Sequence, residues 1–162
     1  MTHIGRAITA RGVKPLVKFR QAFKNTYLYG SFSPINGNSY LMEIEGVSIN
    51  IFETYLNEFS KYKPREFKIV IIDNAGFHST TNMDIPDNIA LINIPPYSPE
   101  LNPAENVWEF MKKRFKNKTF KSLGDVKQWI YDTVNKELTK KRILSTTHND
   151  FYINTINRHL GM

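Results

Sequence analysis

Two short runs of aromatic and β-forming residues open the regular part of the hydrophobic pattern. They span residues 25–33 and 39–45, and the Asn36-Gly37 pair lies between them. Asn-Gly flanked by such runs is a strong short-range signal for a β-hairpin. The pattern therefore predicts two antiparallel strands joined by a tight connection.

The periodicity then changes from that of a strand to that of a helix. Ser48 is a favoured N-cap residue, and Pro64 sets a limit at the other end. Between them, apolar residues recur every three or four positions: Phe52, Tyr55, Leu56 and Phe59. This spacing predicts an amphipathic helix that ends before Pro64.

Two apolar runs without alternation follow. Residues Ile69–Ile72 are four consecutive β-branched residues, and the run stops at Asp73. Such runs are typical of strands that are buried on both faces of a sheet covered by helices. Residues Ile89–Ile94 predict a further strand.

The second half of the chain predicts two helices after the turn PPYSPELNP. The first begins at Pro103, with Asn102 as its cap and an apolar stripe formed by Ala104, Val107, Trp108, Met111 and Phe115. The second begins after Ser122 and carries Leu123, Val126, Ile130, Val134 and Leu138 on one face. Trp108 and Trp129 lie on or beside these stripes, so we expect core packing. Residues 140–162 are polar and Asn-rich, and we expect an irregular tail there.

The element order is hairpin, helix, two strands and two helices. It predicts a single α/β domain over residues 1–162, with a mixed sheet flanked by helices.

Composition narrows the class of protein. Lys and Arg total 22 against 15 Asp and Glu, a net charge of +7, and six basic residues fall between Lys112 and Lys121 without an acid. This charge suits a polyanionic partner, although it also serves solubility.

The absence of Cys excludes disulfides and thiolate metal sites. No run approaches the roughly 20 apolar residues of a membrane helix, and the N-terminus lacks a signal-peptide pattern, so we expect a cytoplasmic protein.

Two carboxylates stand out by position. Asp73 follows a strand at the end where ligands bind in open α/β sheets, although Asp-Asn-Ala-Gly is also good turn sequence. Glu105 lies three residues after Asn102, a spacing that by itself favours a helix capping box over a catalytic role.

Two longer segments add context to these acids. DNAGFH (73–78) and IPPYSPELNPAENVWEFMKKRF (94–115) resemble the mariner-like superfamily of DDE transposases, in particular its bacterial insertion-sequence branch. Residues 117–123 and 12–38 also resemble this branch. The resemblance covers nearly the whole chain.

The resemblance implies a ribonuclease H-like (retroviral-integrase-type) fold and DNA strand cleavage and transfer. In that family three acids bind two Mg²⁺ or Mn²⁺ ions. Asp73 matches the second acid and Glu105 the third, while Asn74 and His78 would lie near the active site. A plain turn role for Asn74 and His78 is equally compatible with the sequence.

The helix that carries Glu105 continues into basic residues. The resemblance to a DNA-processing family favours contact with DNA phosphates at Lys112, Lys113, Arg114 and Lys116, although a solvated helix face would have the same composition.

One part of the family pattern has no match. The first acid belongs to a segment resembling Asp-Glu-x-x-Phe-Gly on the first strand, and neither Glu43 nor Glu45 lies in such a segment. We therefore expect an N-terminally incomplete catalytic domain without the first strand or the helix-turn-helix region. It would be inactive alone, with DNA as partner and a homodimer or a complementing N-terminal fragment as further partners, near the bacterial nucleoid.

Two rival functions differ in class. One is a non-enzymatic DNA-binding remnant that regulates the full-length transposase. The other is a ribonuclease H-like nuclease unrelated to mobile DNA, which the PPYSPELNP signature disfavours.

Overall fold

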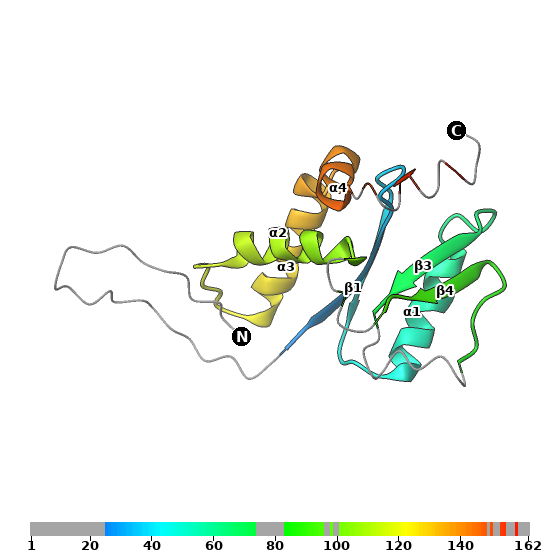
Figure 1. Ribbon diagram of the computed structural model, residues 1–162. Coiled ribbons are helices and arrows are strands. Elements are labelled where there is room, and N and C mark those ends of the chain that lie inside the picture. Colours follow the sequence, from blue (N-terminus) through cyan, green and yellow to red (C-terminus); the bar gives the residue numbers. More distant parts are fainter. Residues whose placement is uncertain are drawn as a thin grey trace.

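A computed structural model describes the fold of residues 25–73, 83–95, 98, 101–148, 150, 153–154 and 158. Within these residues a β-hairpin forms the middle layer (Figure 1). On one side of it lies a helix, whose other side packs against a second small sheet, and on the opposite side lie three further helices. The elements are β1 (Tyr27–Phe32), β2 (Ser39–Ile44), α1 (Ile49–Lys61), β3 (Lys68–Ile72), β4 (Ile89–Asn93), α2 (Ala104–Phe115), α3 (Leu123–Glu137) and α4 (Lys140–Thr147).

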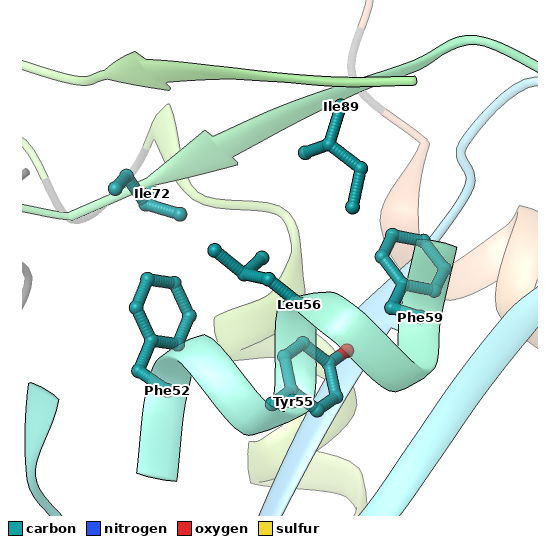
Figure 2. Packing of buried hydrophobic residues seen from close by; sticks show 6 residues of the cluster. All are labelled: Phe52, Tyr55, Leu56, Phe59, Ile72 and Ile89. Atoms are coloured by element: carbon teal, nitrogen blue, oxygen red, sulfur yellow. The ribbon is translucent and has the colours of Figure 1, made fainter. Parts of the chain in front are cut away.

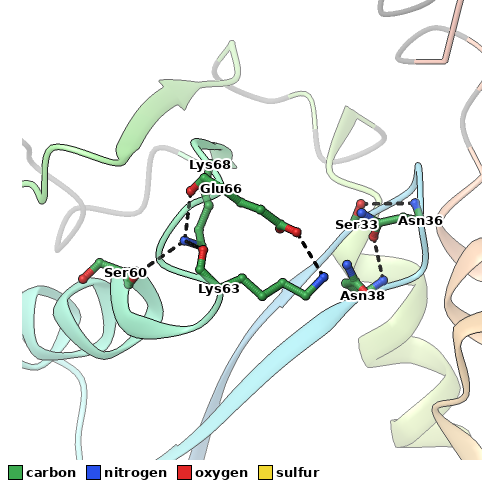
Figure 3. Close-up of polar contacts among 7 residues, drawn as sticks. All are labelled: Ser33, Asn36, Asn38, Ser60, Lys63, Glu66 and Lys68. Atoms are coloured by element: carbon green, nitrogen blue, oxygen red, sulfur yellow. Dashed lines mark hydrogen bonds and ion pairs between the residues drawn. The ribbon is translucent and has the colours of Figure 1, made fainter.

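The predicted hairpin is confirmed. Strands β1 and β2 are antiparallel, and Phe32 pairs with Ser39 at the closing end. Gly37 has a φ of +69°, and its amide donates to the carbonyl of Ser33 (3.0 Å). The Asn38 amide donates to Oδ1 of Asn36 (2.9 Å), one of the contacts drawn in Figure 3. Asn-Gly thus supplies both the left-handed residue and the side-chain acceptor that the loop needs.

Alternation along the hairpin sends its side chains into two different cores. Leu28, Phe32 and Leu41 pack toward α2, α3 and α4. Tyr29, Tyr40 and Met42, their neighbours in sequence or register, pack toward α1. The hairpin is therefore covered on both faces, as the period-two pattern requires.

Helix α1 holds the two sheets together. The hydroxyl of Ser48 accepts a hydrogen bond from the amide of Ile51, so the expected cap is confirmed. Leu56 is fully buried, between the hairpin and the β3–β4 pair. Figure 2 shows it pointing toward Ile72 and Ile89, with the other buried side chains of the helix around it: Phe52, Tyr55 and Phe59.

The expectation that Ile69–Ile72 are buried on both faces is wrong. Strand β3 pairs in parallel with β4 alone among the described strands, and α1 covers one face of this pair. On the other face Ile69 is 65% exposed and Ile92 is 51% exposed. Helices α2 and α4 pack over the hairpin instead, so no helix of the described residues covers the second face of β3–β4 as the apolar run implied.

The turn from α1 into β3 is fixed by a buried lysine. The ammonium of Lys68 donates to the carbonyls of Ser60, Lys63 and Glu66 at 3.3–3.4 Å (Figure 3). Burial lowers the pKa of Lys68. These carbonyls replace the hydrogen bonds to water that the ammonium loses on burial.

The strands form two separate two-stranded sheets within the described residues. The class is mixed α/β, as expected, with an antiparallel and a parallel pair. Each of β1 and β3 has one edge to which no described strand is hydrogen-bonded. Such an edge can accept a further strand.

Helices α2, α3 and α4 form the layer on the other side of the hairpin. Val107 and Met111 of α2 are buried with Leu138, which follows α3. Ser122 and Asp125 form a reciprocal capping box at the start of α3. The ammonium of Lys127 lies 2.5 Å from the carboxylate of Glu43, and this hydrogen bond lowers the pKa of Glu43.

The two tryptophans pack as expected. Trp108 meets Phe32 edge-on, with ring centroids 5.2 Å apart, and Trp129 meets Phe115 at 5.1 Å. Both rings are partly buried: Trp108 packs against the buried cluster of the helical layer, and Trp129 packs with Phe115 and Phe120.

The expected irregular tail begins with a helix. Thr139 caps α4 by accepting a hydrogen bond from the amide of Arg142, and Ile143 and Thr147 are buried one turn apart. The sequence interpretation failed here because only these two positions face the core, too few to stand out in a polar segment.

We expect Gly37→Ala to lower the free energy of unfolding by about 2 kcal/mol. A Cβ at Gly37 would lie 2.5 Å from the carbonyl oxygen of Lys140, and the residue has a φ of +69°. Gly46→Ala is the matched control, because its Cβ would meet only the end of Ile51 at 3.6 Å. Urea unfolding measures both variants, and equal stabilities would contradict the close approach of hairpin and α4.

Candidate metal site and basic surface

Asp73 lies at the carboxyl end of the parallel strand pair. It directly follows Ile72, whose carbonyl accepts a hydrogen bond from the amide of Ile94 (2.9 Å), so the ends of β3 and β4 are tied together. The side chain of Asp73 is partly buried. This is the edge at which ligands meet an open α/β sheet, so the position suits a ligand-binding acid.

Glu105 lies in the first turn of α2, with its side chain exposed. The predicted capping box is wrong. Pro103 is the N-cap, and the side chain of Asn102 accepts from the amide of Ala104 (3.1 Å). No side-chain contact between Glu105 and Asn102 is found in the part of the chain that the structure describes. The carboxylate of Glu105 thus takes no part in a capping box, so helix capping does not account for an acid at this position.

The described residues contain no group of three His, Cys, Asp or Glu side chains that could hold a metal ion. Asp73 and Glu105 are therefore not joined by a third such side chain among these residues. Asn74 and His78, also expected near the site, lie outside the described residues.

The four predicted DNA-binding residues differ in their surroundings. Lys112 and Lys116 are exposed. Lys113 lies 2.9 Å from the carboxylate of Glu109, and its hydrogen bond lowers the pKa of Glu109. Exposed pairs of this kind are weak and screened by salt, so Lys113 can exchange its partner for a phosphate.

Arg114 has a structural role that the sequence did not show. It forms an ion pair with Glu137 at the end of α3, and its guanidinium lies 4.1 Å from the centroid of the Phe110 ring. The ion pair joins the end of α2 to the end of α3, and the ring contact holds the guanidinium against its own helix. Of the four residues, Arg114 is the one whose ion pair reaches another helix and is partly buried, whereas the pair of Lys113 is exposed and lies within α2.

Sequence analysis missed a second group of basic residues, Lys140, Lys141 and Arg142. They occupy the first turn of α4 and are exposed. The signal was available, because three consecutive cations follow Thr139, a favoured N-cap residue. The segment that holds these cations is polar and shows no helical period, so the sequence places it in the irregular tail.

Comparison with known proteins identifies the family. Residues 2–127 match the model of the DDE superfamily endonucleases. This chain belongs to that family. Members of the family generally use divalent metal ions, and such ions prefer oxygen donors of the kind that carboxylates supply.

Relatives and a solved structure agree with this assignment. An uncharacterized protein, y4pE/y4sA of Sinorhizobium fredii, is 34% identical over 102 residues, 62% of this chain and 76% of that protein. The Tc3 transposase of Caenorhabditis elegans is 32% identical over 88 residues, 51% of this chain and 27% of the transposase. Mos1 transposase, solved as a paired-end complex with a left transposon end, has a TM-score of 0.69 at 17% identity and covers 91% of this chain.

These comparisons confirm the resemblance to the catalytic domains of mariner-like DDE transposases and the ribonuclease H-like fold class. The chain spans 47% of the Mos1 chain and a smaller share of Tc3. No helix among the described residues has the length and apolar character needed to cross a membrane.

Proposed function

We propose that this chain is part of an enzyme that cleaves and joins DNA strands during transposition, with Asp73 and Glu105 as metal ligands. The observation that carries the proposal is the placement of these two acids. Asp73 follows β3 at the edge of the parallel pair where ligands bind. Glu105 lies in the first turn of α2 and takes no part in capping that helix. Both are the residues that the family signature matches.

The donor set fits a hard divalent cation. Carboxylate oxygens are the ligands that Mg²⁺ prefers and that Mn²⁺ accepts. When bound, a pair of such ions stabilises charge on the attacking and leaving oxygens of a displacement at phosphorus. The chain itself contributes a strand-held carboxylate and a helix-held carboxylate, while Lys112 and Lys116 attract the phosphate backbone toward α2.

Two carboxylates are too few ligands for two cations. We propose that the third comes from a further strand, carrying the family's first acid, that joins the open edges of β1 and β3. The arrangement of the two sheets supports this proposal. Helix α1 packs against both the β1–β2 and the β3–β4 pair, and no described strand connects the two pairs. An inserted strand would gain hydrogen-bond partners on both of its edges.

We expect the 162-residue chain by itself to cut DNA no faster than buffer in Mg²⁺ or Mn²⁺. The physical reason is that the described residues bring no third carboxylate to Asp73 and Glu105, which leaves the cations weakly held. Nicking of supercoiled plasmid measures this, with Asp73→Ala as the control for contaminating nuclease. Robust nicking that Asp73→Ala abolishes would show that two acids suffice and would contradict the proposed third ligand.

The second candidate function is a DNA-binding regulator without catalysis. The basic residues of α2 and α4 favour it, because they do not depend on the acids. Salt-sensitive DNA binding that survives Asp73→Ala, together with no cleavage in any combination of fragments, is the result that would select this candidate.

A further inference from the structure

The first turn of α4 concentrates positive charge in an unfavourable place. Lys140, Lys141 and Arg142 occupy it, and the turn holds no acidic residue. The N-terminal end of a helix carries a partial positive charge, so cations destabilise it there. A cluster that opposes the local electrostatics of the fold is better explained by an external anion than by stability.

The fold holds this turn rigidly. Ile143 and Thr147 bury the inner face of α4, with exposures of 1% and 0%. The hairpin loop meets the start of the helix so closely that a Cβ on Gly37 would lie 2.9 Å from the Cα of Lys140. The backbone that carries these cations therefore lies packed on the helical side of the hairpin, where Figure 1 draws α4.

Contacts through Phe110 join this turn to the basic end of α2. The guanidinium of Arg114 lies 4.1 Å from the centroid of its ring, and that of Arg142 lies 5.2 Å from it. The last turn of α2 and the first turn of α4 thus adjoin one another at Phe110, and both turns are basic. We call the basic residues at these two places the α2–α4 surface: Lys112, Lys113, Arg114, Lys116, Lys140, Lys141 and Arg142.

The acids near this surface already have cationic partners. Glu137 pairs with Arg114, Glu109 with Lys113, and Asp132 with Lys136 (3.0 Å). Within the described part of the chain, no ion pair involves Lys140 or Lys141. Their charge is available to a partner.

The chemistry of the surface favours nucleic acid over protein. A protein interface normally has an apolar core with a polar rim, whereas contacts to a DNA backbone need chiefly cations. None of the large hydrophobic residues that are exposed in the described structure belongs to α2 or α4. A repeated phosphate backbone fits a surface with cations on two adjoining helices.

We infer that Lys140 and Lys141 bind backbone phosphates of double-stranded DNA, and that they extend the DNA-binding surface from α2 onto α4. This inference rests on the proposed function for the identity of the partner. Arg142 serves both the surface and the packing against Phe110, so the test leaves it unchanged.

The test compares two variants that each remove two positive charges. In one, Lys140→Gln is combined with Lys141→Gln. In the control, Lys61→Gln is combined with Arg65→Gln, at the end of α1 and in the turn that follows it. Binding to a DNA duplex is measured by fluorescence anisotropy over a range of salt concentrations, and each variant is also melted.

The α4 variant should bind DNA about tenfold or more weakly at 0.1 M salt. Its plot of log affinity against log salt should be shallower by about 1.8, or 0.9 per lost phosphate contact. Its melting temperature should stay the same or rise, because two cations leave a positive helix end. A loss of binding with unchanged folding is a result that misfolding would not give.

Three outcomes would overturn the inference. They are unchanged DNA binding in the α4 variant, an equal loss in the control variant, and binding of an acidic polypeptide where DNA duplex is not bound. A different result contradicts the proposed function: DNA cleavage, measured with the third acid supplied, that is unchanged by Asp73→Asn. A failure of one can therefore be told from a failure of the other.

Discussion

Replacing either carboxylate of the candidate metal site is expected to lower cleavage by a completed site at least about 100-fold. Loss of groups that merely orient metal ligands lowers metal affinity or activity by about 10–100-fold, so loss of a ligand should exceed that. The variants are Asp73→Asn and Glu105→Gln, which keep the size of each side chain. The measurement is the rate of strand cleavage in Mg²⁺ and in Mn²⁺.

Matched controls separate this effect from a change in charge or folding. Asp87→Asn removes an exposed acid just before β4, at the opposite end of the strand pair from Asp73. Glu109→Gln removes the acid one turn further along α2 than Glu105 and releases Lys113. Both controls should cleave at near the rate of the unaltered protein. Equal losses in controls and site variants would mean that Asp73 and Glu105 are not metal ligands.

The largest expected effect on stability is that of Leu56→Ala, about 2–5 kcal/mol less free energy of unfolding. Leu56 has no exposed surface and lies where α1 packs against both sheets. Since no described strand connects the hairpin to the β3–β4 pair, the side chains of α1 supply much of their joint packing. Urea unfolding, followed by circular dichroism, gives the change.

Ile49→Ala is the control on the same helix. Ile49 is 39% exposed, so the loss of its side chain should change the free energy of unfolding by roughly 0.5 kcal/mol or less. If the two variants were equally stable, α1 would not be the element that holds the sheets together.

The hairpin and α1 could be predicted because their patterns are local. Asn36-Gly37 defines a loop by backbone conformation, and Ser48 with Phe52, Leu56 and Phe59 defines a helix by spacing. Neither depends on what the rest of the chain does.

The surroundings of β3 and α4 could not be predicted, because they depend on distant elements. The apolar run Ile69–Ile72 shows a strand, but which face is covered depends on where α2 and α4 pack. Helix α4 is stable because Ile143 and Thr147 reach a core built by α2 and the hairpin. A polar segment with two buried positions shows no such periodicity by itself.

The candidate site was predictable in part. The spacing of Glu105 from Asn102 favours capping over metal binding, and only the family signature favours metal binding. In the structure Pro103 is the N-cap and the Asn102 side chain accepts from the amide of Ala104, so the Glu105 carboxylate takes no part in a capping box. The basic surface was predicted only as far as α2, since its continuation on α4 depends on the packing of Arg114 and Arg142 around Phe110.

The most direct test of the central claim is DNA cleavage by this chain with and without a co-expressed fragment that carries the family's first strand and first acid. We predict metal-dependent cleavage only when both are present, and its loss on Asp73→Asn or Glu105→Gln. If no combination cleaves DNA, the two carboxylates are not part of an active site that such a strand completes, and the proposed function is wrong.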